Sequence, residues 1–306
     1  MCQMKLLKIL LLGKNGQVGW ELQRSLAPLG ELICLDSQSA DFCGDFTNLE
    51  GITQTIRAIA PDIIVNAAAH TAVDKAESEP ELARTINALA PAVLAKEAKK
   101  IGAWLVHYST DYVFDGSGEQ PWRETDVTAP LSVYGNTKLE AENAIVASGC
   151  KHLIFRTSWV YAARGGNFAK TMLKLAQERD ALKVISDQIG APTGADLLAD
   201  VTAHAIRTAM LRPEVNGLYH LVASGQTSWH GYANFVIDFA RQAGVDIKVA
   251  VGAIQPVPTT AFPTAAKRPL NSRLDTNKLQ NTFDLKLPHW QSGVIRMLTE
   301  ILEKNR

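Results

Sequence analysis

Hydrophobic residues in the first half of the chain gather in short, nearly continuous runs, separated by longer segments in which they recur every three or four positions. Continuous apolar runs are typical of strands covered on both faces, and the longer period is typical of helices. The runs predict strands at residues 6–12, 31–35, 62–67, 104–108 and 152–156. The longer period predicts helices at residues 17–29, 79–101 and 131–147. Alternating strands and helices indicate parallel strands joined by right-handed crossovers.

The second half of the chain is less regular. It predicts helices at residues 167–179, 195–211, 229–243 and 289–304, extended segments at 182–186 and 217–221, and a loop at 251–269. We therefore expect an α/β protein with a Rossmann-type, doubly wound parallel sheet. The dinucleotide-binding lobe would span residues 1–160, with residues 182–222 returning to the sheet region. Most of residues 161–306 would form a smaller C-terminal α/β lobe that binds the substrate.

Composition and charge narrow the possible partners. Of the 306 residues, 46% are hydrophobic and 20% are charged, the balance of a globular protein. The formal net charge is zero and no long run of Lys or Arg occurs, so neither nucleic acid nor a membrane is an expected partner. The four cysteines do not have the spacing of a disulfide framework or of a zinc finger; they are Cys2, Cys34, Cys43 and Cys150. We therefore expect a reduced, cytoplasmic setting.

A glycine-rich turn follows the first predicted strand. Gly13, Gly16 and Gly19 have the spacing GxxGxxG and enclose Gln17 and Val18. Glycines at such a turn let backbone N–H groups approach a pyrophosphate at the start of the next helix. The spacing differs from the GxGxxG of the standard dinucleotide fingerprint, and glycines are also common in ordinary turns. The turn alone therefore leaves both interpretations open.

Asp36 follows the second predicted strand, about 20 residues beyond the glycines, where an acidic residue can bind the adenosine ribose. A solvated turn aspartate is the alternative. A carboxylate here favours NADH because it repels the 2′-phosphate of NADPH, whereas Lys14 within the turn offsets that repulsion. We therefore expect the protein to use both NADPH and NADH. Further contacts with the dinucleotide are expected from Asp45, Phe46, Ala69, His70 and Thr71.

Tyr134 and Lys138 are four residues apart on a predicted helix, so their side chains share one face. An ammonium near a phenol lowers the phenol pKa from its ordinary value of about 10, and such a pair can exchange a proton with a substrate oxygen. Ser109, Thr110 and Asp111 follow the fourth predicted strand, where their polar groups can bind the same oxygen. A surface tyrosine and strand-end capping are the plain alternatives. Together with the glycine turn, these residues predict an NAD(P)H-dependent oxidoreductase.

These motifs carry a family resemblance. GxxGxxG, Asn66-Ala67-Ala68, Ser109-Thr110-Asp111 and Tyr134-x-x-x-Lys138 together resemble the extended short-chain dehydrogenase/reductases. Longer strings narrow the resemblance to the dTDP-4-dehydrorhamnose reductase family. They are GKNGQVG at 13–19, NAAAHTAVDKAE at 66–77, YSTDYVFDG at 108–116, RTSWVY at 156–161 and RPLNSRL at 268–274. The resemblance extends over nearly the whole chain.

The resemblance implies the last step of dTDP-L-rhamnose synthesis for cell-surface polysaccharide. In that step dTDP-4-dehydro-β-L-rhamnose is reduced at C4 of the sugar by NADPH or NADH. Tyr134 would donate the proton to the forming alkoxide, while Lys138 would lower the tyrosine pKa and bind the nicotinamide ribose. Thr110 would orient the carbonyl, with Asp111 beside it at the sugar.

Three further substrate contacts are implied. Trp159 would pack against the deoxysugar, although a core tryptophan is an equal alternative without the family match. Arg268 and Arg273 would meet the pyrophosphate of the nucleotide, although a solvated loop explains them almost as well.

Metal binding and two rival functions complete the expectations. Some members of the family are dimers that share Mg2+ through positions that correspond to Glu21, Asp196 and Asp200, so a structural magnesium and a homodimer are among the expected states. Solvated helix carboxylates are the favoured alternative.

The rival functions are a nucleotide-sugar epimerase or dehydratase of the same fold, and a non-catalytic regulatory subunit that binds a nucleotide. The run Thr110-Asp111-Tyr112 lacks the glutamate that dehydratases carry after Thr-Asp, which disfavours dehydration.

Overall fold

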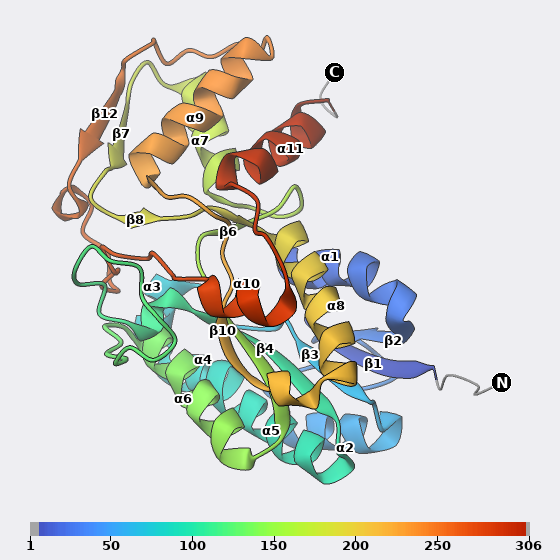
Figure 1. Cartoon of the computed structure of the whole chain (residues 1–306). Coiled ribbons are helices and arrows are strands. Elements are labelled where there is room, and N and C mark those ends of the chain that lie inside the picture. Colours follow the sequence, from blue (N-terminus) through green and yellow to red (C-terminus); the bar gives the residue numbers. More distant parts are fainter. Residues whose placement is uncertain (1–5, 304–306) are drawn as a thin grey trace.

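The computed structural model describes residues 6–303 and has a six-stranded parallel sheet at its centre (Figure 1). The strands lie in the order β10-β5-β4-β3-β1-β2, so the chain reverses its direction of travel across the sheet between β1 and β3. Ligands of open α/β sheets bind beyond the carboxyl ends of the strands at such a reversal. The strands are β1 Leu7–Leu12, β2 Gly30–Leu35, β3 Ile63–Asn66, β4 Trp104–Thr110, β5 Lys151–Thr157 and β10 Gly217–His220.

Helices cover both faces of the sheet. Successive side chains of each strand point to opposite faces, so a continuous apolar strand needs a helical layer on each side. Ile9 and Leu11 belong to one buried core, which α1, α8 and α10 complete. Leu10 and Leu12 belong to a second core, which α2, α5 and α6 complete. This double coverage explains the continuous apolar runs of the strands. The six helices are α1 Gln17–Leu26, α2 Leu49–Ile59, α5 Ala90–Ile101, α6 Val133–Ser148, α8 Ala195–Leu211 and α10 Asn277–Phe283.

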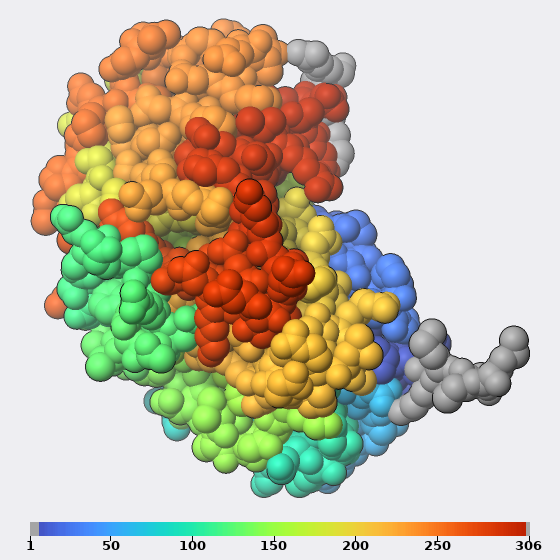
Figure 2. All heavy atoms as spheres, viewed as in Figure 1, coloured from blue at the N-terminus to red at the C-terminus, as the bar shows by residue number. Residues whose placement is uncertain are grey.

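A smaller group of helices lies beyond one end of the sheet, at the top of Figure 1. It contains α7 (Phe168–Glu178), α9 (Trp229–Gln242) and α11 (Trp290–Glu303), which share an apolar core of their own. Beside them, β7 (Leu182–Ile185) pairs with β12 (Ile254–Val257). In the space-filling view the orange and dark red atoms of α9 and α11 form this upper part, and α10 lies on the surface below it (Figure 2).

Short elements connect these parts. They are η1 Ala27–Leu29, α3 Val73–Ser78, α4 Pro80–Arg84, the π-helical η2 Thr85–Leu89, η3 Asp111–Val113, β6 Val160–Tyr161, β8 Ile189–Gly190, β9 Thr193–Gly194, η4 Pro213–Val215, β11 Thr227–Ser228 and η5 Thr259–Ala261. Among residues 6–303, no helix combines the length and the apolar character needed to cross a bilayer. Cys2 lies outside the described residues.

The predicted fold class is confirmed, and the differences concern particular segments. The expected helix at 79–101 is divided into α4, η2 and α5, and Asn87 in the π-helical turn exchanges two hydrogen bonds with the backbone of His70. The expected loop at 251–269 contains β12 and η5, and α2, α3 and α10 were missed. Of residues 182–222, β10 joins the sheet whereas β7 does not. The division into two lobes near residue 160 stays a prediction.

Candidate active site

The turn between β1 and α1 is so tight that side chains would not fit at two of its glycines. Gly13 has a φ of +87°, in the left-handed region that favours glycine, and a Cβ there would lie 2.6 Å from the backbone nitrogen of Ala68. A Cβ at Gly19 would overlap the carbonyl oxygen of Gly13. Gly16 is the N-cap of α1 and brings no capping side chain, so the positive end of the helix is left for an anion.

A cavity of about 260 Å3 opens at the carboxyl ends of β1, β2 and β3, beside this turn. Six of the residues predicted to bind the dinucleotide line it, namely Gly13, Gly16, Asp36, Asp45, Phe46 and Ala69. Gln17, Val18, His70 and Thr71 do not line it; the Gln17 side chain instead accepts a hydrogen bond from Asn167 at 3.5 Å. Small and backbone groups, at Ala67 and Ala68 among others, form much of the remaining wall. The donors and the space fit the nucleotide end of a nicotinamide dinucleotide.

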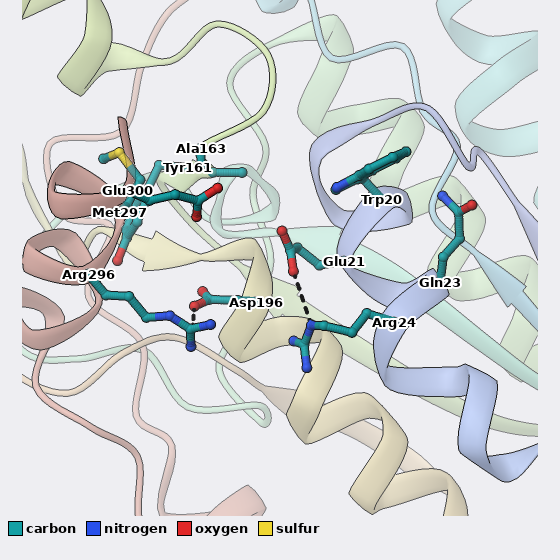
Figure 3. Close-up of a pocket in the computed structure, with 11 residues that line it drawn as sticks. Trp20, Glu21, Gln23, Arg24, Tyr161, Ala163, Asp196, Arg296, Met297 and Glu300 are labelled. Carbon is teal, nitrogen blue, oxygen red and sulfur yellow. Dashed lines mark ion pairs between the residues drawn. The ribbon is translucent and has the colours of Figure 1, made fainter. Parts of the chain in front are cut away.

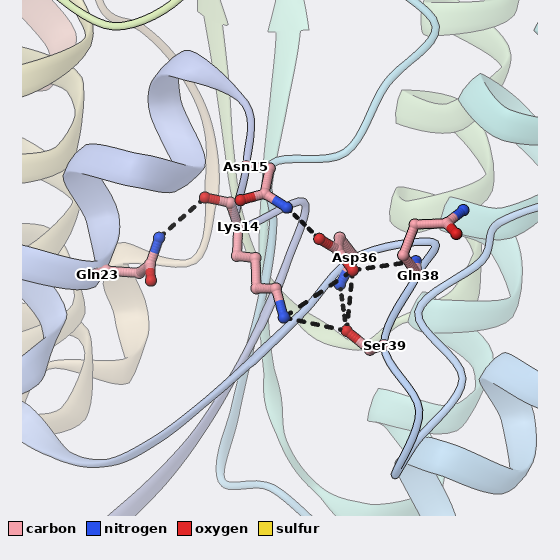
Figure 4. A network of polar contacts seen from close by, with 6 residues as sticks. All are labelled: Lys14, Asn15, Gln23, Asp36, Gln38 and Ser39. Carbon is pink, nitrogen blue, oxygen red and sulfur yellow. Dashed lines mark hydrogen bonds and ion pairs between the residues drawn. The ribbon is translucent and has the colours of Figure 1, made fainter.

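Asp36 is held from several sides at the end of β2 (Figure 4). Its Oδ1 accepts hydrogen bonds from the backbone N–H of Gln38 and from the hydroxyl of Ser39, both at 3.0 Å, and its Oδ2 accepts from the amide of Asn15. Lys14 donates to the Ser39 hydroxyl at 3.2 Å and its Nζ lies 3.9 Å from Asp36 Oδ1. Burial alone would raise the pKa of Asp36, but these partners outweigh it and lower the pKa below its usual value. The carboxylate is therefore ionised and oriented.

Tyr134 and Lys138 lie in the first turns of α6, which Ser132 caps by accepting a hydrogen bond from the backbone N–H of Gly135 at 3.2 Å. The Lys138 side chain is buried and only 2% exposed. Its Nζ donates to the carbonyl oxygen of Tyr108 at 2.6 Å and lies 3.2 Å from Nε2 of His107. Burial lowers the pKa of Lys138 to about 8, against the opposing effect of the Glu142 carboxylate. Lys138 therefore titrates near the pH at which enzymes work.

Thr110 and Asp111 meet Tyr134 at the carboxyl end of β4. Thr110 Oγ1 donates to Asp111 Oδ1 at 3.1 Å, and the ring of Tyr112 packs edge-on against the ring of Tyr134 with centroids 5.5 Å apart. Burial raises the pKa of Tyr134 to about 12; the Asp111 charge adds to this effect, and a hydrogen bond with Thr110 opposes it. Burial also raises the pKa of Asp111 to about 6, against hydrogen bonds with Ser272 and Thr110. Tyr134 is thus a protonated phenol, as a proton donor must be, and the lowering of its pKa by Lys138 stays a prediction.

A second cavity, of about 320 Å3, is walled by aromatic side chains next to Tyr112. The rings of Trp159 and Trp229 stack with centroids 3.6 Å apart and an angle of 13° between their planes. Trp159 has a φ of +50°, a conformation that is rare for a bulky residue and is found at functional sites. Trp229 was not predicted; its Nε1 donates to Gln188 Oε1 at 2.9 Å, and both residues line the cavity. The stacked pair offers a flat apolar wall for a sugar or a base.

The two arginines predicted to meet a pyrophosphate lie in different places. Arg268 lines the aromatic cavity and pairs with the carboxylate of Asp74 at 2.5 Å. Arg273 lines a separate cavity, where its Nε donates to the side chain of Gln226 at 2.6 Å and its Nη1 donates to Asn271 at 3.0 Å. The structure therefore brings Arg268, but not Arg273, to the aromatic cavity.

The predicted magnesium site is not supported. Glu21 and Asp196 line a surface cavity between α1, α8 and α11, but each carboxylate has an arginine partner (Figure 3). Arg24 lies 3.5 Å from Glu21 and 2.8 Å from Asp200, and Arg296 lies 3.4 Å from Asp196. Within residues 6–303, no group of three or more His, Cys, Asp or Glu side chains is arranged to hold a metal ion. The expected metal ligands are therefore members of ion pairs, and the predicted homodimer stays a prediction.

Comparison with known proteins bears on this geometry directly. The family model for the RmlD substrate binding domain matches residues 7–303. A dTDP-4-dehydrorhamnose reductase from Escherichia coli strain K12 is 64% identical over 295 residues, which cover 96% of this chain and 98% of that protein. The chain belongs to the dTDP-4-dehydrorhamnose reductase family. The resemblance inferred from the motifs is thereby confirmed.

Solved structures of this family have the same fold. A dTDP-4-dehydrorhamnose reductase from Clostridium acetobutylicum is 38% identical and superposes with a TM-score of 0.86, covering 96% of this chain and 99% of that one. A dTDP-4-dehydrorhamnose reductase from Bacillus anthracis, solved in complex with NADP, is 34% identical with a TM-score of 0.85 and the same coverage, 96% and 99%. A member of the family that shares this fold therefore binds a nicotinamide dinucleotide.

Proposed function

We propose that this protein reduces the C4 keto group of dTDP-4-dehydro-β-L-rhamnose to give dTDP-L-rhamnose, using NADPH or NADH, as the last step of dTDP-rhamnose synthesis. The observation that carries the proposal is the half-buried Tyr134 phenol hydrogen-bonded with Thr110, in a chain 64% identical to a dTDP-4-dehydrorhamnose reductase. A protonated phenol and a hydroxyl at one strand end are suited to an oxygen that gains a proton. The aromatic cavity next to Tyr112 provides room for a nucleotide-linked sugar.

The glycine turn and the cavity at β1, β2 and β3 would hold the dinucleotide, because Gly13 and Gly16 line the cavity and the uncapped start of α1 offers backbone N–H groups to a pyrophosphate. When bound, the nicotinamide supplies the hydride for the C4 carbonyl carbon. Tyr134 donates its proton to the C4 oxygen as that carbon is reduced, and the Thr110 hydroxyl binds the same oxygen. Lys138, when charged, stabilises the tyrosinate that remains.

The substrate would lie along the aromatic cavity. Trp159 and Trp229 form an apolar face for the deoxysugar, whose 6-methyl group is apolar and forms no hydrogen bonds. Arg268 would exchange its surface partner Asp74 for a phosphate oxygen, to which a guanidinium binds with two parallel hydrogen bonds.

A turnover assay separates this proposal from its rivals. We expect the purified protein to oxidise one equivalent of added NADPH or NADH for each equivalent of dTDP-4-dehydrorhamnose, and to oxidise none with dTDP-glucose. An epimerase or dehydratase would carry tightly held cofactor and show no net oxidation, and a regulatory subunit would bind a nucleotide without turnover. Absence of net NAD(P)H oxidation with the 4-keto sugar would refute the proposal.

The Lys14 network supports the use of both cofactors and predicts how one of them can be lost. We expect Lys14→Ala to raise the Kd of NADPH about tenfold and that of NADH by less than about twofold, because a charge-assisted hydrogen bond to phosphate is worth about 1.5–3 kcal/mol. In NADH the Asp36 carboxylate meets a ribose hydroxyl and needs no cation. Titration of each cofactor by fluorescence measures both constants. Lys99→Ala is the matched control, since Lys99 donates to the carbonyl oxygen of Gly149 at the far end of α6, away from the glycine turn. An equal loss of both affinities would contradict the assignment.

A further inference from the structure

A buried polar chain leads to Lys138 from the neighbouring strand β3, through a histidine that the reaction described above does not use. Asn66 at the end of β3 contacts Nδ1 of His107 on β4 at 3.0 Å, and His107 Nε2 lies 3.2 Å from Lys138 Nζ. The three side chains are 1%, 1% and 2% exposed, so no bulk water competes for these contacts. In such a chain the direction of each hydrogen bond is determined by its neighbours.

The direction is set at the β3 end, where the backbone N–H of Ala68 donates to Asn66 Oδ1 at 3.0 Å. A backbone N–H can only donate, so the Asn66 side chain must present its NH2 group to His107. His107 Nδ1 therefore accepts. Burial lowers the pKa of His107 well below its usual value, so the ring is neutral, and because Nδ1 accepts, its single proton is on Nε2. His107 Nε2 consequently donates toward Lys138.

An ammonium cannot accept a hydrogen bond, whereas an amine can. Lys138 already donates to the carbonyl oxygen of Tyr108 at 2.6 Å, and as an amine it keeps a lone pair for His107 Nε2–H. As an ammonium it would set two donors against each other at 3.2 Å in a site without solvent. We propose that His107, oriented by Asn66, is a positioning residue that favours the uncharged amine of Lys138 over its ammonium. The inference rests on the proposed function, in which Lys138 is the partner of Tyr134.

Other charged groups near Lys138 do not replace this control. Charged groups on α6 and on the elements packed against it form ion pairs or hydrogen bonds with other residues. They are Glu142 with Arg156 on β5, Glu140 with Arg84 on α4, Glu77 on α3 with the backbone N–H of Val133, Lys99 on α5 with the carbonyl of Gly149, and Asp111 in η3 with Thr110. The two hydrogen-bonding contacts of Lys138 Nζ are the carbonyl oxygen of Tyr108, which does not titrate, and Nε2 of His107, so the tautomer of His107 decides which form of the lysine is favoured.

The consequence concerns the pH at which the reaction fails. Proton donation by Tyr134 leaves a tyrosinate, which a charged Lys138 stabilises and an amine does not. Because His107 favours the amine, it lowers the pH above which that stabilisation is lost. His107 therefore sets the alkaline limb of the pH profile of kcat. Replacing its Nε2–H by an acceptor favours the ammonium and moves the limb to higher pH.

Two variants reverse the hydrogen bond in different ways. His107→Gln places an amide where its oxygen can accept from an ammonium. Asn66→Asp keeps the oxygen that accepts from Ala68 N–H but offers a second acceptor to His107, which moves the ring proton to Nδ1 and frees Nε2 to accept. In both variants we expect the pKa of Lys138 to rise by about one unit or more, a typical size for such shifts. His152→Gln is the matched control, because His152 is also buried but its Nδ1 contacts the carbonyl oxygen of Cys150.

Titration of the Lys138 side chain by 13C NMR, with the signal assigned by its absence in Lys138→Met, measures this shift without turnover. The proposal expects the alkaline limb of kcat to move with the Lys138 pKa in the two variants and not in the control, while the Kd of NADPH stays within about twofold. An unchanged Lys138 titration in the folded variants, or an equal loss of kcat at every pH, would overturn it. Because the titration needs no substrate, failure of this inference is distinguishable from failure of the proposed reaction.

Discussion

Tyr134→Phe is expected to lower kcat with dTDP-4-dehydrorhamnose by about 10²–10⁴-fold, the usual contribution of a positioned general acid. The variant loses only the phenolic hydroxyl, and the ring that packs against Tyr112 remains. The proposed cofactor site is the glycine turn and the cavity at β1, β2 and β3, which Tyr134 does not line, so we expect the Kd of NADPH to stay within about threefold. Steady-state kinetics and a fluorescence titration measure the two quantities.

Tyr219→Phe is the control for this variant. It removes a tyrosine hydroxyl that donates to the carbonyl oxygen of Val215 at 2.7 Å on the edge strand β10, away from Tyr134. Its kcat should match that of the unaltered protein. Near-normal kcat in Tyr134→Phe would show that the proton comes from elsewhere, and Asp111, whose pKa burial raises to about 6, would be the next group to test.

Arg156→Met is expected to lower the free energy of unfolding by about 3–5 kcal/mol, because it leaves a buried carboxylate without its partner. Arg156 on β5 and Glu142 on α6 form two parallel hydrogen bonds, at 2.9 Å and 2.6 Å, and each side chain is only 4% exposed. The pair joins α6 to the sheet, one helical turn beyond Lys138. Denaturation in urea measures the loss.

The chain offers a surface pair on the same helix as the control. Arg84 on α4 and Glu140 on α6 also form a forked ion pair, at 2.7 Å, but their side chains are 47% and 40% exposed. Arg84→Met should therefore cost less than about 1 kcal/mol. The double variant Arg156→Met, Glu142→Leu should regain most of the loss, because both charges are then removed together. Equal losses in Arg84→Met and Arg156→Met would contradict this account of burial.

Local sequence patterns were sufficient for the sheet and for much of the candidate site. The strands could be predicted from their apolar runs because helices bury both faces of the sheet. Ile9 lies in the core on one face, and its neighbour Leu10 lies in the core on the other. Tyr134 and Lys138 lie one helical turn apart, and Thr110 ends the preceding strand. Local spacing was therefore enough to predict that the three side chains belong to one site. The glycines of the first turn were readable because only glycine fits there.

Contacts between distant segments were not predictable in this way. Asn66 and His107 are 41 positions apart and meet only because β3 and β4 are neighbours in the sheet. Trp229 at the start of α9 stacks on Trp159, 70 positions earlier in the segment between β5 and β6, and no local pattern predicts this contact. The arginine partners of Asp196 and Asp200 were missed for the same reason, since Arg296 and Arg24 belong to other helices, whereas Glu21 and Arg24 are only three residues apart on α1. Helix α2 was missed although Ile52, Ile56 and Ile59 have helical spacing, which is a signal that was present.

Transfer of deuterium from the cofactor to the sugar tests the central claim most directly. The protein is incubated with dTDP-4-dehydrorhamnose and NADPH that carries deuterium at both positions of nicotinamide C4, and the product is examined by proton NMR. The proposed reaction predicts dTDP-L-rhamnose with one deuterium, at C4 of the sugar, and none at C6. A product without deuterium, or with deuterium at another carbon, would contradict the account.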